Sequence, residues 1–427
     1  MKVLLLALAA LLFTPPLHAE TSGLDVGADP RDLPMEELRL FAEVIERIRA
    51  AYVEDVDEAE LLEAAIRGML NELDPHSAYL SPEEFDDLRD TTRGEFGGIG
   101  IEISMDDGML RVVAPIDDTP ASEAGLKTGD MILRINDESV RGMSMQDAVK
   151  RLRGEPGTDV ELQLLREDGE SPETITLTRD TIRIQSVRSD MPVPGFGYLR
   201  ISQFQRHTAS DLARHLEELK AREELKGLVL DLRNNPGGTL EGAIEVANVF
   251  LDGGLVVYTQ GRDEGSRVDY EADSGDAAPD IPIVVLVNSG SASASEIVAG
   301  ALQDQGRAIV MGRPTFGKGS VQTVLPLHRD RALKLTTARY YTPSGRSIQV
   351  EGIAPDIEVE VARVEIQPRR ERREVDLPRH LLADQDIPME EDPDAEEEPE
   401  PLASRDHMLY QAISVLRGIE LSGRMRR

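Results

Sequence analysis

Two short segments carry a serine and a lysine in settings where each side chain could do chemistry. Ser293 lies in the stretch VNSGSASASEIVAGAL, in which small residues lead from an apolar, strand-like run into a helix. A serine at such a turn exposes its hydroxyl beside free backbone N–H groups, where the helix dipole favours a developing oxyanion. Ser293 is therefore a candidate nucleophile, although Ser293 and Glu296 also match a capping box that would only begin the helix.

A serine nucleophile needs a base, and Lys318 in TFGKGSVQ is the candidate. The seven histidines are scattered, and none lies in a triad-like motif. A neutral lysine requires its pKa to fall by about three units from about 10.4, roughly 4 kcal/mol, which desolvation can supply. No acidic residue lies between Gly312 and Leu327. On a strand, Lys318, Ser320 and Gln322 would share one face, so Gln322 could hold the amine by hydrogen bonding. The alternative is an exposed loop lysine.

Nucleotide binding and metal binding are two other functions that the sequence allows to be tested. The stretch from Gly312 to Lys318 matches the glycine and lysine positions of a phosphate-binding loop, but Gly319 stands where that loop needs Ser or Thr for magnesium. The residues that follow alternate as in a strand, whereas a phosphate-binding loop opens a helix. Asp231 follows an apolar run, as a magnesium-binding aspartate would, yet buried strands often end in Asp. With no HExxH or similar spacing, the sequence predicts no metal site.

Length and composition limit the class of protein. A chain of 427 residues is long enough for two or three domains. Its net charge of −33 repels nucleic acid, which is therefore not an expected partner. Without Cys the chain can form neither a disulfide nor a thiol nucleophile. Residues 1–19 contain a basic residue, an eleven-residue apolar stretch and a cleavage site at Ala19, which together predict a secretory signal peptide; an uncleaved anchor is the alternative.

Amphipathic helices are predicted at both ends of the chain. Apolar residues from Leu38 to Tyr52 recur at three- and four-residue steps, and a second helix runs from a cap at Asp57 to Leu73. Asp406 could cap a last short helix with an apolar face formed by Leu409, Ile413 and Leu416. These helices either pack on the core or bury their apolar faces against a second subunit.

An acidic segment separates the last helix from the rest of the chain. Residues 384–400 hold ten acidic residues in seventeen and no basic one. Such a segment buries too little apolar surface to offset the entropy of ordering it, so it is predicted to be a disordered linker. A docking tail for a basic partner is the alternative.

Residues 94–180 read as a compact β-rich module. Paired strands surround AGLKTGDMILRIND, and a helix capped by Ser144 follows. This arrangement resembles a PDZ domain. In that family a glycine-rich turn presents backbone N–H groups to a peptide's terminal carboxylate while the peptide joins the edge of the sheet. The resemblance places that turn at Phe96, Gly97, Gly98, Ile99 and Gly100, and an ordinary glycine turn in a small sheet is the alternative.

From Gly195 onward strands and helices alternate, which predicts an α/β core with strands buried on both faces. SASASE, then TFGKGSVQ, with DLRNNPGG upstream, closely resemble the carboxyl-terminal processing proteases, also called tail-specific proteases. The resemblance implies a crotonase-like α/β core. It also assigns Ser293 as nucleophile, Lys318 as general base and Gln322 as the residue that positions the lysine. Backbone N–H groups of Gly238 and Ala294 would form the oxyanion hole.

The resemblance implies an exported serine endopeptidase that binds a substrate's free C-terminus on the PDZ domain and cleaves nearby, with no cofactor. The expected compartment is a bacterial periplasm or cell envelope. The expected partners are protein or peptide substrates with free C-termini and an activating adaptor protein. The chain is also expected to form a homo-oligomer, such as a dimer. A non-catalytic PDZ adaptor and a nucleotidase remain the rival functions. The predicted architecture is α/β and multidomain: signal peptide (1–19), helical segment (20–93), PDZ domain (94–180), protease core (181–362), charged linker (363–405) and C-terminal helix (406–427).

Overall fold

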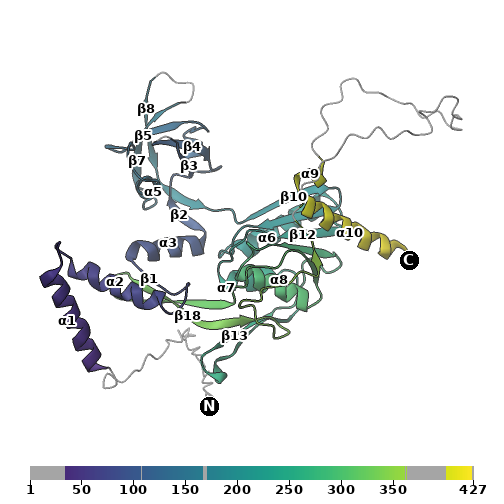
Figure 1. Cartoon of the computed structure of the whole chain (residues 1–427). Helices are drawn as coiled ribbons and strands as arrows, with labels where there is room; N and C mark the ends of the chain where they lie inside the picture. Colours follow the sequence, from purple (N-terminus) through teal and green to yellow (C-terminus); the bar gives the residue numbers. More distant parts are fainter. Residues whose placement is uncertain (1–33, 107, 167–170, 361, 363–400, 426–427) are drawn as a thin grey trace, which may run out of the picture. The chain divides into compact units, whose positions relative to one another are not determined.

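The chain divides into two compact units, Met1–Met69 and Leu70–Arg427 (Figure 1). The predicted signal peptide and the predicted acidic linker lie outside the residues that the computed structural model describes. None of the helices within the described part is long and apolar enough to cross a membrane. The described residues are 34–106, 108–166, 171–360, 362 and 401–425.

The first unit contains α1 (Met35–Ala51) and all but the last two residues of α2 (Glu58–Asn71). The side chain of Asp57 accepts two backbone N–H groups of the first turn of α2, at 2.7 and 3.1 Å, which confirms the predicted cap. No side chain of α1 is buried, and Phe41 on its apolar face is 43% exposed. Both predicted helices are thus present, and their use in an oligomer stays a prediction.

The β-rich module within the second unit is an antiparallel sheet with strand order β3-β4-β5-β7-β8, and β6 pairs with β5. Its apolar core includes Leu110, Ile132 and Leu162, none of which is exposed. The hydroxyl of Ser144 accepts the N–H of Asp147 at 3.1 Å and caps α5 as predicted. Beside this sheet, β2 and β9 form a separate two-stranded ribbon. The elements are β2 (Glu95–Gly98), β3 (Ile101–Asp106), β4 (Met109–Pro115), α4 (Pro120–Glu123), β5 (Met131–Ile135), β6 (Glu138–Ser139), α5 (Met145–Leu152), β7 (Asp159–Leu165), β8 (Glu173–Thr178) and β9 (Asp180–Arg183).

The central sheet of the α/β core has strand order β10-β11-β12-β15-β16-β19. From β11 onward neighbouring strands are parallel, while β10 is antiparallel to β11. The predicted helix TASDLARHLEELKAR is α6. The elements of this layer are β10 (Val187–Val193), β11 (Phe196–Ile201), α6 (Thr208–Arg222), β12 (Gly227–Asp231), α7 (Leu240–Asn248), β15 (Ile283–Val287), α8 (Ala294–Asp304), β16 (Ala308–Gly312), β19 (Ile357–Glu358), α9 (Leu402–Arg405) and α10 (His407–Met425).

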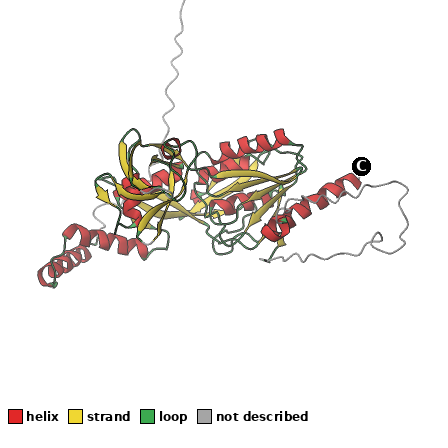
Figure 2. Ribbon diagram, turned by 90° about the horizontal axis from the view of Figure 1, so that it is seen from above, coloured by secondary structure: helices red, strands yellow, loops and turns green. Residues whose placement is uncertain are grey.

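The central sheet is covered on both faces, as the apolar strands predicted (Figures 1 and 2). Side chains of one strand alternate between faces. In β15, Val285 packs with α6, α7 and α8, whereas Val284 and Leu286 pack with α10. Leu409, Ile413 and Leu416 of α10 are buried, so the predicted apolar face of the last helix is confirmed. The helix has 19 residues and is longer than the short helix expected.

A second sheet lies at the edge of the core and includes the strand that follows Lys318. Its order is β1-β18-β13-β14, and β17 also pairs with β18. Helix α3 begins with a capping box between Ser81 and Glu84 and ends at Gly94, just before the β-rich module. The elements are β1 (Ala78–Leu80), α3 (Pro82–Arg93), β13 (Gly254–Gly261), a 3-10 turn (Glu264–Ser266), β14 (Val268–Ala272), β17 (Ser320–Pro326) and β18 (Ala332–Tyr341).

Candidate active site

Three neighbouring parallel strands bring the candidate residues to one edge of the central sheet. Strands β12, β15 and β16 lie side by side. Each is followed by one candidate segment: the turn with Gly238, the segment with Ser293 and the loop with Lys318. The carboxyl ends of parallel strands meet at the same edge, which is where α/β sheets carry their sites. The strand order therefore assembles residues that are far apart in the sequence.

Ser293 stands at the start of α8 in a strained backbone conformation. Its φ is 54° and its ψ is −112°, a region that residues with a side chain rarely occupy. Such strain costs about 1–3 kcal/mol and concentrates at functional sites. The residue is 9% exposed, and its N–H donates to Glu296 Oε2 at 2.7 Å. The sharp turn therefore sets the serine at the positive end of the helix dipole.

The turn after β12 lies directly against the serine segment. Gly237 has a φ of 108°, and a Cβ there would lie 2.9 Å from the carbonyl oxygen of Ala292 and from Ser293 Cβ. A Cβ on Gly238 would lie 2.0 Å from the carbonyl oxygen of Phe204, so both positions need glycine. Among the described residues, the N–H groups of Gly238 and Ala294 donate to no protein acceptor. Two free donors thus lie in adjacent turns.

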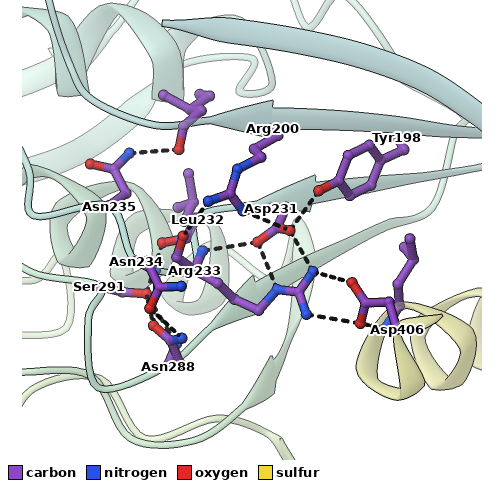
Figure 3. Close-up of polar contacts among 12 residues, drawn as sticks. Tyr198, Arg200, Asp231, Leu232, Arg233, Asn234, Asn235, Asn288, Ser291 and Asp406 are labelled. Carbon is purple, nitrogen blue, oxygen red and sulfur yellow. Dashed lines mark hydrogen bonds and ion pairs between the residues drawn. The ribbon is translucent and has the colours of Figure 1, made fainter. Parts of the chain in front are cut away.

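Asn235 joins these two turns. It is fully buried, and its side chain donates to the carbonyl of Ile201 and accepts the N–H of Gly237, each at 2.9 Å. Its own carbonyl accepts the N–H of Ala292 at 3.0 Å and the hydroxyl of Ser295 at 2.8 Å. Figure 3 shows Asn235 with the hydrogen bond that its side chain donates to the backbone of β11. The glycine turn and the serine segment consequently form one hydrogen-bonded unit.

Lys318 lies in the loop between β16 and β17 and is half-buried. Desolvation, and then repulsion from the nearby Lys334, lowers the pKa of Lys318, while Glu296 and Asp74 oppose that shift. The prediction that Lys318 shares a strand face with Gln322 is wrong, because β17 begins only at Ser320. The ladder is also irregular between Val321 and Gln322. The sequence did not indicate Lys334, which is close only because β18 pairs with β17.

A buried carboxylate links the serine and the lysine. Glu296 is completely buried and its Oε2 accepts the N–H of both Ser293, at 2.7 Å, and Lys318, at 2.9 Å. Its Oε1 accepts the N–H of Gly317 at 2.7 Å and the hydroxyl of Thr315 at 2.6 Å. Sequence reasoning treated Glu296 only as a helix-capping partner, and its second set of contacts could not be read from local spacing.

Gln322 lies in β17 near the lysine. Its side-chain N–H group donates to the hydroxyl of Ser320 at 2.9 Å and, more weakly, to that of Thr336 at 3.4 Å. Its amide oxygen accepts no hydrogen bond from the part of the chain that the structure describes. Ser293, Lys318, Gln322 and Gly238 all line one cavity of about 760 Å³. Ala294 does not line it. The wall also includes apolar and cationic side chains, among them Phe85, Leu88, Arg89, Leu240, Val321 and Lys334.

Only part of the predicted carboxylate-binding segment, residues 96–100, is a turn in the structure. Phe96, Gly97 and Gly98 lie in β2 and pair with β9, and Ile99 and Gly100 follow before β3. Gly100 has a φ of 77° and its missing Cβ would lie 2.4 Å from a side-chain atom of Thr119, so only glycine fits there. None of these five residues lines the cavity of Ser293. Carboxylate binding at this turn stays a prediction.

Comparison with known proteins identifies the family. The chain is 48% identical to a carboxy-terminal-processing protease of Bartonella bacilliformis over 329 residues, which cover 76% of this chain and 75% of that protein. The chain belongs to the carboxy-terminal processing proteases. It is 41% identical to a Synechocystis carboxyl-terminal-processing protease, over 69% of this chain and 70% of that protein. It is 37% identical to the carboxy-terminal processing protease CtpA of Bacillus subtilis, over 74% of this chain and 67% of that protein.

Three protein-family models match separate ranges of the chain. Residues 195–359 match peptidase family S41, residues 111–166 match the PDZ domain, and residues 14–84 match the N-terminal domain of the activating protease CtpB. A solved photosystem II D1 C-terminal processing protease is 33% identical, covers 76% of this chain and 93% of its own, and has a TM-score of 0.45. The matches to peptidase family S41 and to the PDZ domain, with the α/β topology of the core, show that the protein is a serine-type peptidase with a PDZ domain, as predicted.

Substitution of Lys334 tests what sets the pKa of Lys318. Because Lys334 repels the charged form of Lys318, Lys334→Gln should raise the pKa of Lys318. The fraction of neutral Lys318 at any given pH should then fall, and its titration should move to higher pH. Competitive labelling of lysines with acetic anhydride across a pH series, read by mass spectrometry, measures this titration. The exposed Lys127→Gln is the control, and an unmoved Lys318 titration in Lys334→Gln would refute the electrostatic account.

Proposed function

We propose that the protein is an exported serine endopeptidase in which Ser293 is the nucleophile and Lys318 the general base. The observation that carries the proposal is the single cavity that Ser293 and Lys318 share. Within it, the serine has a strained backbone at a helix start and the lysine has a lowered pKa. General-base activation of serine requires a neutral base beside a hydroxyl that faces the cavity where substrate can bind.

The reaction follows from these positions. Neutral Lys318 takes the proton of the Ser293 hydroxyl as Oγ bonds to the carbonyl carbon of the scissile peptide. The oxyanion that forms is stabilised by the free N–H groups of Gly238 and Ala294, which need no reorganisation. The ammonium of Lys318 then protonates the leaving amine, and the C–N bond breaks to give an acyl-enzyme. Lys318 next takes a proton from a water whose oxygen bonds to the acyl carbon, and it passes that proton to Ser293 Oγ as the acyl–oxygen bond breaks, which restores the neutral lysine and the serine hydroxyl.

Gln322 is proposed to position Lys318 during these proton transfers. Its amide N–H group is already directed to Ser320 and Thr336, which orients the amide oxygen as a remaining acceptor. An uncharged acceptor holds the amine without the stabilising charge that would keep the lysine protonated. None of the steps uses a metal or a cofactor.

Substrate choice and location complete the proposal. The turn of residues 96–100 is proposed to bind the terminal carboxylate of a protein or peptide, since the PDZ domain binds peptide ends in this way. The bacterial relatives and the predicted signal peptide favour a periplasmic or cell-envelope location. The exposed apolar face of α1 favours a homo-oligomer, and the match to an activating-protease domain favours an adaptor protein as a further partner.

Removal of either catalytic group tests the mechanism. Ser293→Ala and Lys318→Ala should each lower cleavage of an unstructured protein with an apolar C-terminus by at least about 10³-fold, because losing a nucleophile or its base removes the covalent pathway. Cleavage is followed by gel and mass spectrometry. Ser210→Ala on the exposed surface of α6 is the matched control. Wild-type cleavage by Ser293→Ala would contradict the proposal, and binding without any cleavage by the wild type would favour an adaptor.

Blocking the substrate's C-terminus tests recognition separately. A peptide with a C-terminal amide should show a KM about 10- to 100-fold higher than the free acid, because a charge-assisted hydrogen bond contributes about 1.5–3 kcal/mol. The kcat should stay the same, since the reacting groups are unaffected. Steady-state kinetics of the two peptides measures both constants. Equal KM values would show that the terminal carboxylate is not recognised.

A further inference from the structure

The C-terminal helix is attached to the core by an ion pair at its first turn. Asp406 precedes α10, and its carboxylate accepts two hydrogen bonds from Arg233, from Nη1 at 2.9 Å and from Nη2 at 2.6 Å (Figure 3). The same carboxylate accepts the N–H of Leu409 at 3.0 Å and so caps the helix. Burial opposes ionisation, but the bonds from Arg233 keep the pKa of Asp406 below its ordinary value. The ionised carboxylate is therefore both the cap and the anchor of α10.

Arg233 lies between two carboxylates. On its other side is Asp231, which is completely buried and accepts Arg233 Nε at 2.9 Å and Nη2 at 2.6 Å. Desolvation alone would lower the pKa of Arg233, but the two carboxylates raise it above the ordinary arginine range. Tyr198 and Arg200 also donate to Asp231, at 2.7 and 3.2 Å. If either carboxylate were lost, the largely buried guanidinium of Arg233 would keep only one of its two negatively charged partners, which is destabilising.

The backbone of Arg233 leads directly into the turn that carries Gly238. Its carbonyl accepts Arg200 Nη2 at 3.2 Å, and its N–H donates to Asp231 at 2.9 Å. The next residue, Asn234, has a φ of 56°, and its N–H donates to Asn288 Oδ1 at 2.9 Å. Asn234 and Asn288 also bond through their side chains at 2.9 Å, so the turn is fixed from both strands (Figure 3).

Helix α10 reaches this position from far along the sequence. Residues 363–400, which separate β19 from α9 and α10 in the sequence, lie outside the described residues. Leu409, Ile413 and Leu416 then cover the face of the sheet that α6, α7 and α8 do not cover. Apolar packing holds the helix on the sheet, whereas the Asp406–Arg233 pair is its charged contact at the edge where the site lies.

We propose that Asp406 is a positioning residue for the catalytic site, and that through Arg233 the C-terminal helix holds the turn that carries the Gly238 N–H. The catalytic part of this inference rests on the proposed function of that N–H group. Its structural part, the dependence of the turn on Asp406, stands independently. Displacement of α10 would then slow the chemical step rather than weaken substrate binding.

Hydrogen–deuterium exchange of the full-length protein tests the structural part without reference to activity. Asp406→Ala should increase exchange in peptides covering residues 232–239 by about tenfold, because the turn opens locally more often. Asp406→Asn is the second variant, since it keeps the size and the helix cap while weakening the ion pair. Glu420→Ala removes an exposed ion pair with Arg424 on the same helix and should leave the turn unchanged. Increased exchange confined to residues 402–425, with the turn unaffected, would overturn the proposal.

Kinetics tests the catalytic part at a temperature where each variant is shown by circular dichroism to be folded. Asp406→Ala should lower kcat by about 10- to 100-fold with KM unchanged, since a small misplacement of a catalytic group costs that much. Asp406→Glu should recover part of the loss. An unchanged kcat together with a more mobile turn would refute the catalytic role. Absence of hydrolysis by the wild type would instead refute the proposed function, and exchange would still decide whether the turn depends on Asp406.

Discussion

The site depends on one buried carboxylate that binds two separate pieces of backbone. Glu296 receives the N–H groups of Ser293 and Lys318 on a single oxygen, and its other oxygen holds the loop that precedes the lysine. A buried carboxylate is costly unless several donors satisfy it, so Glu296 favours the arrangement in which both segments donate to it. The same charge favours the protonated lysine, and burial together with Lys334 outweighs it. Glu296 thus holds the serine and lysine segments in place, while its charge acts against the lowered pKa of Lys318.

The fold supplies these contacts by ordering three strands side by side. Because β12, β15 and β16 are adjacent and parallel, the glycine turn, the serine segment and the lysine loop all leave the sheet at the same edge. Asn235 then joins the first two, and Glu296 joins the last two. The sheet itself needs cover on both faces, and α10 provides it on one. The C-terminal helix is therefore a part of the peptidase core despite its distance in sequence.

Much of this could be predicted from the sequence where local patterns carry the information. Helix α6 matches its predicted segment, and the caps at Asp57, Ser144 and Asp406 follow from residue types that satisfy free N–H groups. Ser293 and Lys318 could be selected because small residues at a helix start and an acid-free loop are unusual settings. Membership of the protease family followed from the same segments.

The remaining features depend on contacts between distant segments. The position of Lys318 before β17, and not on it, depends on how β17 pairs with β18. The contacts of Glu296 with the lysine loop and of Arg233 with Asp406 join residues 22 and 173 positions apart. Nothing in local spacing indicates such pairs, because they are fixed by the strand order and by the return of α10 to the sheet. The one sequence signal that could have pointed to Glu296 is an acidic residue close to the candidate nucleophile within an otherwise small and apolar segment.

The most direct test of this account is the steady-state kinetics of Glu296→Gln, an isosteric change that replaces one acceptor oxygen with a donor. The new amide N–H group would then point at a backbone N–H group that Glu296 now accepts, and two donors cannot bond to each other. The serine and lysine segments should therefore separate slightly in a protein that remains folded. We predict a kcat at least about tenfold lower with KM unchanged. A folded Glu296→Gln variant with the wild-type kcat would contradict the claim that this carboxylate holds Ser293 and Lys318 in a working arrangement.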